Sequence, residues 1–168
     1  AETSGGGFYL HNATTPIIFN VTAVNNTANV LGAGMLCSST NSVVQNSIFY
    51  SNQSTDGVQI HLQGSSEIFV LYSDIAGGEA GIIGFDDIIY TNNIDQNPDF
   101  IDPDNEDYAL LITSPVIDAG NPNAPEDPDG TVADMGAYYF AQDGIPNIET
   151  NVSLLEFSGV AVNSSYSV

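Results

Sequence analysis

Gly5-Gly6-Gly7-Phe8-Tyr9-Leu10 recurs at an offset of 27 as Gly32-Ala33-Gly34-Met35-Leu36-Cys37. In the same way, Ile17-Ile18-Phe19-Asn20 recurs at an offset of 26 as Val43-Val44-Gln45-Asn46. Gly, Asn, Ser and Thr, which form turns, separate these short apolar runs, and a third, weaker copy passes through Ile60-His61-Leu62. Short strands at this distance are typical of one coil of a parallel β-solenoid, whereas a helical repeat needs longer runs with a 3.6-residue period.

The repeat also predicts which residues stack on one another. Successive coils lie about 4.8 Å apart, so Val43 is expected over Ile17 in an inner apolar column. Asn46 over Asn20, and Asn52 over Asn26, are expected to form amide ladders at corners. The alternative is an antiparallel sandwich with Asn-rich turns. Because solenoids usually need three or more repeats, the two clear copies indicate the last coils of a longer solenoid.

The composition changes near residue 84. Two thirds of the 21 acidic residues and all but one of the eight prolines lie between Asp86 and Pro146. We therefore expect coils over residues 1–84 and an irregular acidic cap over 85–140 that covers the open β edge. A linker is expected over 141–150, and strands of a following or donated β module over 151–168.

The charge of the chain excludes several classes of function. It has no Lys or Arg, 21 acidic residues and a formal net charge of −21. Nucleic-acid binding and polybasic membrane contacts both require basic side chains, and the apolar runs are too short to span a bilayer. The single cysteine, Cys37, cannot form an internal disulfide and is interpreted as a small core residue.

Several motifs in the region of the expected cap carry a resemblance to a known family. They occur in the order Asn97-Pro98-Asp99-Phe100, Asp107-Tyr108-Ala109-Leu110, Ser114-Pro115-Val116-Ile117-Asp118-Ala119-Gly120, Asp127-Pro128-Asp129-Gly130 and Asp134-Met135-Gly136-Ala137-Tyr138. This series resembles the C-terminal end of right-handed parallel β-helix proteins of bacterial surfaces, the group with the choice-of-anchor Q type ending. Residues 154–160 resemble the start of a Hydin-like immunoglobulin-type module. The resemblance implies an all-β fold, a right-handed parallel β-helix end with a loop-rich acidic cap, and an extracellular or cell-surface location.

Calcium is the one candidate cofactor in the sequence. Aspartates on short turns offer the hard oxygen ligands that Ca²⁺ prefers, although neither cluster matches an EF-hand loop. The candidate ligands are Asp102, Asp104, Asp107, Asp127, Asp129 and Asp134. The alternative is that these aspartates stabilise turns by accepting hydrogen bonds from nearby backbone N–H groups.

Asn-x-Ser/Thr sequons are a second kind of candidate site. The predicted glycosylation acceptors are Asn12, Asn25, Asn52, Asn151 and Asn163. Asn20 also begins a sequon, but its predicted place in a ladder is incompatible with a glycan. In a lineage with N-glycosylation, such sequons indicate exposed surface.

These observations favour a non-catalytic extracellular or cell-surface protein with a structural or adhesive role. Elimination by a β-helix lyase needs a Lys or Arg base, and hydrolysis needs paired carboxylates at a set separation. His11 and His61 have no partner pattern and are interpreted as surface or turn residues. The alternatives are a fragment of a secreted polysaccharide-degrading β-helix enzyme and a glycan-binding module. Open β edges also predict self-association, end to end or by strand donation, into a filament.

Overall fold

The computed structural model describes residues 4–12, 15–56, 58–84 and 87–142. The fold is all-β, and the described residues contain no α-helix. The strands are β1 (Phe8–His11), β2 (Ile17–Phe19), β3 (Thr22–Val24), β4 (Met35–Ser38), β5 (Asn41–Gln45), β6 (Ile48–Tyr50), β7 (Ile60–Gln63), β8 (Glu67–Leu71), β9 (Asp74–Ile75), β10 (Ile82–Ile83), β11 (Asp87–Thr91), β12 (Phe100–Asp102) and β13 (Asp107–Leu110). Two short 3-10 helices, Gly78–Gly81 and Pro103–Asn105, complete the elements.

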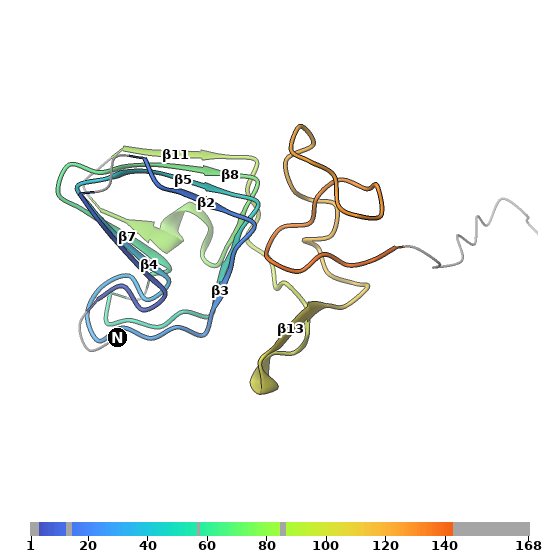
Figure 1. Ribbon diagram of the computed structural model, residues 1–168. Helices are drawn as coiled ribbons and strands as arrows, with labels where there is room; N and C mark the ends of the chain where they lie inside the picture. Colours follow the sequence, from blue (N-terminus) through green and yellow to red (C-terminus); the bar gives the residue numbers. More distant parts are fainter. Residues whose placement is uncertain (1–3, 13–14, 57, 85–86, 143–168) are drawn as a thin grey trace, which may run out of the picture.

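Three parallel sheets form one body, which we call the stack (Figure 1). Their strand orders are β1-β4-β7-β10, β2-β5-β8-β11 and β3-β6-β9, so the chain visits the three sheets in turn. We call each passage a round: β1–β3 make the first, β4–β6 the second, β7–β9 the third, and β10 and β11 belong to a fourth. All strand pairs in the stack are parallel, so the antiparallel sandwich alternative is wrong.

The register agrees with the sequence repeat. Ile17 pairs with Val43, and Met35 pairs with Ile60 of the third copy. Side chains alternate between the two faces of each strand, and the inward ones fill the interior of the stack. The core includes Ile18, Met35, Cys37, Val44, Phe49, Ile60, Leu62, Ile68, Val70 and Ile75. The expected core position of Cys37 is confirmed, because its side chain is fully buried.

The predicted inner column is displaced by one residue. Ile17 is 68% exposed, whereas its neighbour Ile18 is buried against the core. The paired residues Ile17 and Val43 therefore stack on the outer face of their sheet, and Ile18 and Val44 stack inside. A shift of one residue along a strand exchanges the two faces, and the uniformly apolar Ile17-Ile18-Phe19 contains no alternation that distinguishes them.

The corner between the second and third sheets repeats one backbone conformation. Asn20, Asn46, Tyr72 and Asn92 all have positive φ, between 48° and 57°. Non-glycine residues seldom adopt this region, and Asn does so more readily than most. The next residue in three rounds carries a polar side chain into a ladder. Ser47 Oγ accepts from the N–H of Val21, and Ser73 Oγ accepts from the N–H of Ser47, both at 3.1 Å.

The two predicted amide ladders have different outcomes. Asn52 Oδ1 accepts hydrogen bonds from the backbone N–H and from Nδ2 of Asn26, each at 2.9 Å, so this ladder is confirmed. The predicted ladder of Asn20 and Asn46 is wrong. Asn46 Oδ1 instead accepts from the N–H of Asn121 at 2.8 Å, and Asn20 Oδ1 is buried with no hydrogen-bond partner among the described residues.

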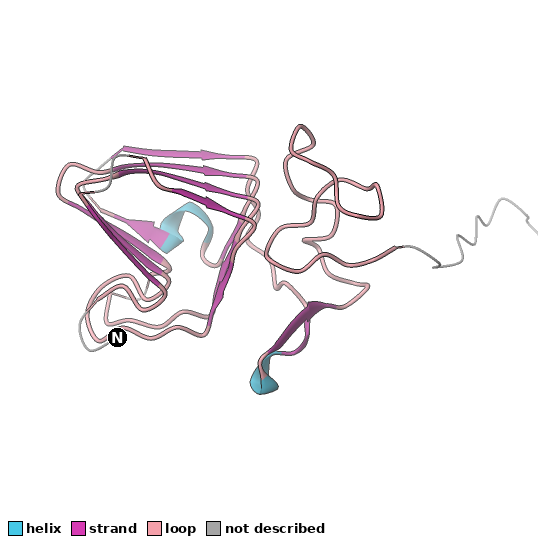
Figure 2. Ribbon diagram, in the orientation of Figure 1, coloured by secondary structure: helices cyan, strands magenta, loops and turns pink. Residues whose placement is uncertain are grey.

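The stacked strands continue beyond the boundary that we expected at residue 84. β11 pairs with β8 over its whole length, and Ile94 forms a parallel bridge to Asp74. Residues 95–142, which we call the acidic segment, follow this last passage. They are largely loop apart from the hairpin formed by β12 and β13 (Figure 2).

The acidic segment lies along the β3-β6-β9 side of the stack rather than over its end (Figure 1). Phe100, Leu110, Val116 and Met135 pack with Ile48 in a second apolar cluster that also includes Val24, Tyr50 and Tyr72. The N–H of Ala137 donates to Thr22 Oγ1 of the first round at 2.9 Å, and the N–H of Gly136 donates to the Asn46 carbonyl of the second at 2.7 Å. The expected position over the open end is therefore wrong. The apolar outer faces of β3 and β6 provide the surface on which this segment is buried.

Candidate functional site

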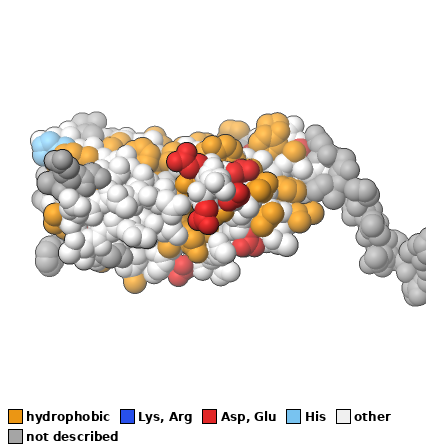
Figure 3. All heavy atoms as spheres, turned by 90° about the horizontal axis from the view of Figure 1, so that it is seen from below, with side chains coloured by type: hydrophobic (Ala, Val, Ile, Leu, Met, Phe, Trp, Pro, Cys, Tyr) orange, Lys and Arg blue, Asp and Glu red, His pale blue; other side chains and the backbone are white. Residues whose placement is uncertain are grey.

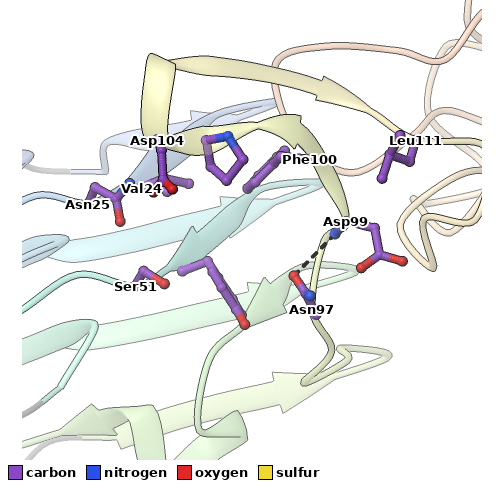
Figure 4. A pocket seen from close by; sticks show the side chains of 10 residues that line it. Val24, Asn25, Ser51, Asn97, Asp99, Phe100, Asp104 and Leu111 are labelled. Atoms are coloured by element: carbon purple, nitrogen blue, oxygen red, sulfur yellow. Dashed lines mark hydrogen bonds between the residues drawn. The ribbon is translucent and has the colours of Figure 1, made fainter.

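A groove of about 250 Å³ lies between the stack and the acidic segment (Figure 4). It exists because the hairpin of β12 and β13 stands beside the ends of β3 and β6. The residues that line it are Val24, Asn25, Tyr50, Ser51, Asn97, Asp99, Phe100, Pro103, Asp104 and Leu111. A groove of this size can hold a small ligand.

The wall on the side of the stack comes from two successive rounds. Val24 pairs with Tyr50 in register, and Asn25 and Ser51 follow them at the next corner. Asn25 and Ser51 both have positive φ, 56° and 53°, and both side chains are exposed. The repeat therefore places one amide and one hydroxyl group, one round apart, at the edge of the groove.

Hydrogen bonds and ring packing fix the opposite wall. Asn97 Oδ1 accepts from the N–H of Asp99 at 3.2 Å, as the dashed line in Figure 4 shows. Asp99 Oδ2 accepts from Thr113 Oγ1 at 3.2 Å. The ring of Phe100 packs edge-on against Tyr108, with 5.4 Å between the ring centroids. The side chains of this wall are thus held in place before any ligand binds.

The groove combines polar and apolar side chains. Its polar side chains are amides, hydroxyls and the carboxylates of Asp99 and Asp104, and its apolar surface comes from Tyr50, Phe100 and Leu111. The lining includes no His or Cys, so Ser51 has no histidine base beside it within the lining. The chain has no Lys or Arg to attract an anion. The arrangement suits a ligand that is neutral or cationic and rich in hydrogen-bonding groups.

The predicted calcium ligands fall into two separate groups. Asp102, Asp104 and Asp107 belong to the hairpin, where acidic side chains gather on the surface shown in Figure 3. Asp102 Oδ2 accepts from Asn105 Nδ2 at 2.8 Å, and Asp107 Oδ1 accepts from the N–H of Ala109 at 3.1 Å. Asp107 thus accepts from a nearby backbone N–H, as the alternative interpretation expected, whereas Asp102 accepts from a neighbouring side chain.

The other three aspartates organise the loops after the hairpin. Asp127 Oδ2 accepts from the N–H of Asp134 at 2.7 Å, Asp134 Oδ2 accepts from the N–H of Phe140 at 2.6 Å, and Asp129 Oδ2 accepts from the N–H of Gln142 at 2.8 Å. Burial raises the pKa of Asp134 and of Asp127, although these accepted bonds oppose the shift. Bonds from Gln142 and Thr131 lower the pKa of Asp129.

Within the described ranges, no group of three or more His, Cys, Asp or Glu side chains is arranged so that it could hold a metal ion. The structure therefore does not bring the six predicted ligands together in one cluster. Calcium binding stays a prediction.

The predicted glycosylation acceptors differ in exposure. Asn12 and Asn25 are exposed. Asn52 is 5% exposed, and its Nδ2 donates to the Ala23 carbonyl and to Gln59 Oε1, both at 2.8 Å. The prediction of a glycan on Asn52 is therefore wrong, because the amide nitrogen is buried and already bonded. Asn151 and Asn163 lie outside the described residues.

Two features were missed at the level of sequence. His61 is a residue of β7 rather than a turn residue, and its Nδ1 lies 2.7 Å from Asp56 Oδ2. Burial alone would raise the pKa of Asp56, but hydrogen bonds from Ser54, the Gly32 N–H and His61 together lower it. Asp74 is the second feature, since it is completely buried in β9. For the contact between the Gly32 N–H and Asp56, the signal in the sequence is the repeat, because these two residues lie about one round apart.

Comparison with known proteins adds no relative, because no family model, curated protein or solved structure matches the chain. No helix in the part of the chain that the structure describes is both long and apolar enough to cross a membrane.

Proposed function

We propose that the stack is the end of a right-handed parallel β-helix, with the acidic segment as its C-terminal part. The three in-register parallel sheets, visited in turn by the chain, support this assignment. Right-handed crossovers are the rule when parallel strands of one sheet are connected. The choice-of-anchor Q type resemblance and the Hydin-like resemblance of the tail add to the proposal and assign the chain to a protein of a bacterial surface.

The function that we propose is structural and adhesive, without catalysis, in an extracellular or cell-surface protein. The carrying observation is the stack itself, in which backbone pairing and inward columns join every round to the next. Such a body extends by adding rounds, and an unpaired strand edge at its end can pair with another chain. End-to-end association, or strand donation by residues 151–168, would give a filament.

Light scattering tests the assembly on the full chain and on a chain that ends at Gln142. Assembly predicts species much heavier than a single chain, and a loss of these species in the shortened chain. Chelation of calcium should weaken assembly if divalent ions offset the repulsion between subunits that each carry a charge of −21. Monomeric masses for both chains, with and without calcium, would exclude the filament.

Glycan binding is the second candidate, and the groove between β3, β6 and the hairpin favours it. The groove combines aromatic rings, amides, hydroxyls and carboxylates in about 250 Å³. Hydroxyl-rich neutral saccharides match these groups, whereas uronates would be repelled by Asp99 and Asp104.

Calorimetry with neutral and with uronic-acid oligosaccharides tests this candidate. The double variant Asn25→Gly/Ser51→Gly removes two lining side chains at positions whose positive φ suits glycine. Asn12→Gly is the matched control, because Asn12 has φ 49° and does not line the groove. Binding of neutral sugars that only the double variant loses supports the candidate, and cleavage of the sugar would instead favour a carbohydrate-active enzyme.

A further inference from the structure

The outer face of the β2-β5-β8-β11 sheet carries a continuous apolar column. Ile17, Val43, Phe69 and Ile89 follow one another in register across the four strands. Their neighbours Ile18, Val44, Ile68 and Val70 point inward and are buried. A second column beside the first contains Phe19, Gln45 and Leu71. Ile17 and Phe19 are 68% and 40% exposed, and the residues of the later strands in both columns are half-buried.

The outer face of the β1-β4-β7-β10 sheet is also partly exposed, with Tyr9 at 57% and Ile83 at 37%, whereas that of the β3-β6-β9 sheet is covered. Leu36 on β4 lies between Tyr9 and His61 in register and is 3% exposed. Val24 and Tyr50 on β3 and β6 are packed under the acidic segment, which lies on that side in Figure 1. Parallel sheets are normally covered on both faces, and contiguous exposed apolar surface marks interaction sites. Of the two exposed faces, the β2-β5-β8-β11 face carries an apolar side chain in register on all four strands, whereas the corresponding column of the other face includes His61.

Two carboxylates on the same face indicate the charge of that partner. Glu67 and Asp87 stand directly opposite each other in register, two residues before Phe69 and Ile89. Like charges directly opposite on adjacent strands are destabilising. The chain has no Lys or Arg to place between them. A cation supplied from outside would relieve this repulsion.

We propose that this face binds a segment of another protein that carries apolar side chains next to Lys or Arg. The apolar side chains would cover the Ile17–Val43–Phe69–Ile89 column, and the basic group would lie between Glu67 and Asp87. Four strands span about 14 Å, which matches one extended segment rather than a broad protein surface. A second copy of the chain and residues 143–168 fit less well, because neither contains a basic side chain to pair with the carboxylates.

Binding of two synthetic ten-residue peptides to the full chain tests the proposal. One peptide alternates Val with Lys and the other alternates Val with Glu, and both are measured at about 10 mM and about 150 mM NaCl. The proposal predicts that only the Val/Lys peptide binds. Glu67→Gln/Asp87→Asn should weaken its binding roughly tenfold at low salt, and Phe69→Thr should weaken it roughly tenfold at both salt concentrations.

Matched controls separate a specific site from general attraction to an acidic protein. Glu106→Gln/Asp107→Asn removes the same number of charges from the hairpin, and Ile112→Thr removes an apolar side chain that is 65% exposed elsewhere. These controls should bind as the unaltered chain does, and circular dichroism checks that every variant is folded. The proposal would be overturned if the hairpin variant weakened peptide binding as much as Glu67→Gln/Asp87→Asn does. It would also be overturned if the chain formed a dimer that Phe69→Thr dissociates, or if deletion of residues 143–168 were needed to expose the β2-β5-β8-β11 face.

Discussion

Asp74 is a carboxylate in a fully buried position. Its Oδ1 accepts from the N–H of Gln96 at 3.1 Å, whereas no hydrogen-bond partner of Oδ2 occurs among the described residues. Burial raises the pKa of Asp74 to about 7, and the neighbouring Asp95 adds to the shift, while the bond from Gln96 opposes it. Ionising this side chain therefore acts against folding.

The sign of the pH dependence follows from that shift. The folded-state pKa lies above the 3.8 of an ordinary aspartate, so the unfolded chain loses this proton first. The contribution of Asp74 to stability is complete at low pH and is lost as the pH rises through about 7. Asp74→Asn should therefore gain stability relative to the unaltered chain as the pH rises. The difference in their free energies of unfolding should change by a few kcal/mol between acid and alkaline pH, in favour of the variant.

Urea unfolding of the two chains from about pH 4 to pH 8 measures this difference. Asp104→Asn serves as the control, since Asp104 is exposed in the hairpin. Stability curves that run parallel for Asp74→Asn and the unaltered chain would contradict the prediction. A curve for Asp104→Asn that follows the unaltered chain would show that the effect depends on burial.

Among the elements, the rounds are the part that the sequence predicts best. Short apolar runs at offsets of 26 and 27 place Val43 opposite Ile17 and Met35 opposite Phe8, because nearly the same number of residues closes each of these rounds. The sequence repeat does not predict the fourth round, because Ile88 pairs with Ile68 at a shorter offset than those of the earlier rounds. A shorter connection preserves the stack but changes the period.

The position of the acidic segment shows what the repeat cannot predict. Asn46 occupies its expected corner, yet its side chain bonds to Asn121, 75 residues away. The groove has the same origin, because Asn25 and Ser51 meet Asp99 and Asp104 only once the segment has packed on β3 and β6. A periodic pattern fixes contacts between rounds, whereas contacts with a non-repeating segment depend on surfaces that the fold creates.

Met135 tests how strongly that segment is held. It is 1% exposed and lies in the cluster with Ile48, Phe100 and Val116. Met135→Ala should lower the free energy of unfolding by about 2–5 kcal/mol, because it leaves a cavity in a buried cluster. Faster proteolysis within residues 95–142 than within the stack would show that the segment detaches first. Ile112→Ala, at a position that is 65% exposed, should change stability by less than about 0.5 kcal/mol.

The whole molecule is dominated by its charge of −21. With no Lys or Arg, the carboxylates repel one another at every separation that salt does not screen. Raising NaCl from about 10 mM to about 150 mM shortens the screening length from about 30 Å to about 8 Å, so the melting temperature should rise by several degrees at pH 7. Thermal unfolding followed by circular dichroism measures the change. An unchanged or falling melting temperature would contradict this account.

Calcium chloride at matched ionic strength extends the same measurement to the predicted metal site. A further rise in the melting temperature beyond that in NaCl would indicate binding to the folded state. Asp127→Asn/Asp129→Asn should abolish the additional rise if these residues bind calcium. An identical melting temperature in the two salts would argue against a specific site.

The path of the acidic segment has a mechanical consequence. The hydrogen bonds between rounds run along the axis of the stack, so a pulling force along that axis would separate the rounds one after another. Residues 120–137 contact successive rounds along this axis. They bond to Thr22 in the first round and to Asn46 in the second, and the apolar cluster that contains Met135 also includes Tyr72 in the third. The segment therefore connects the rounds in addition to the backbone hydrogen bonds between them. Separation of the first and second rounds also requires the bonds from this segment to Thr22 and Asn46 to break, so the two rounds resist tension together.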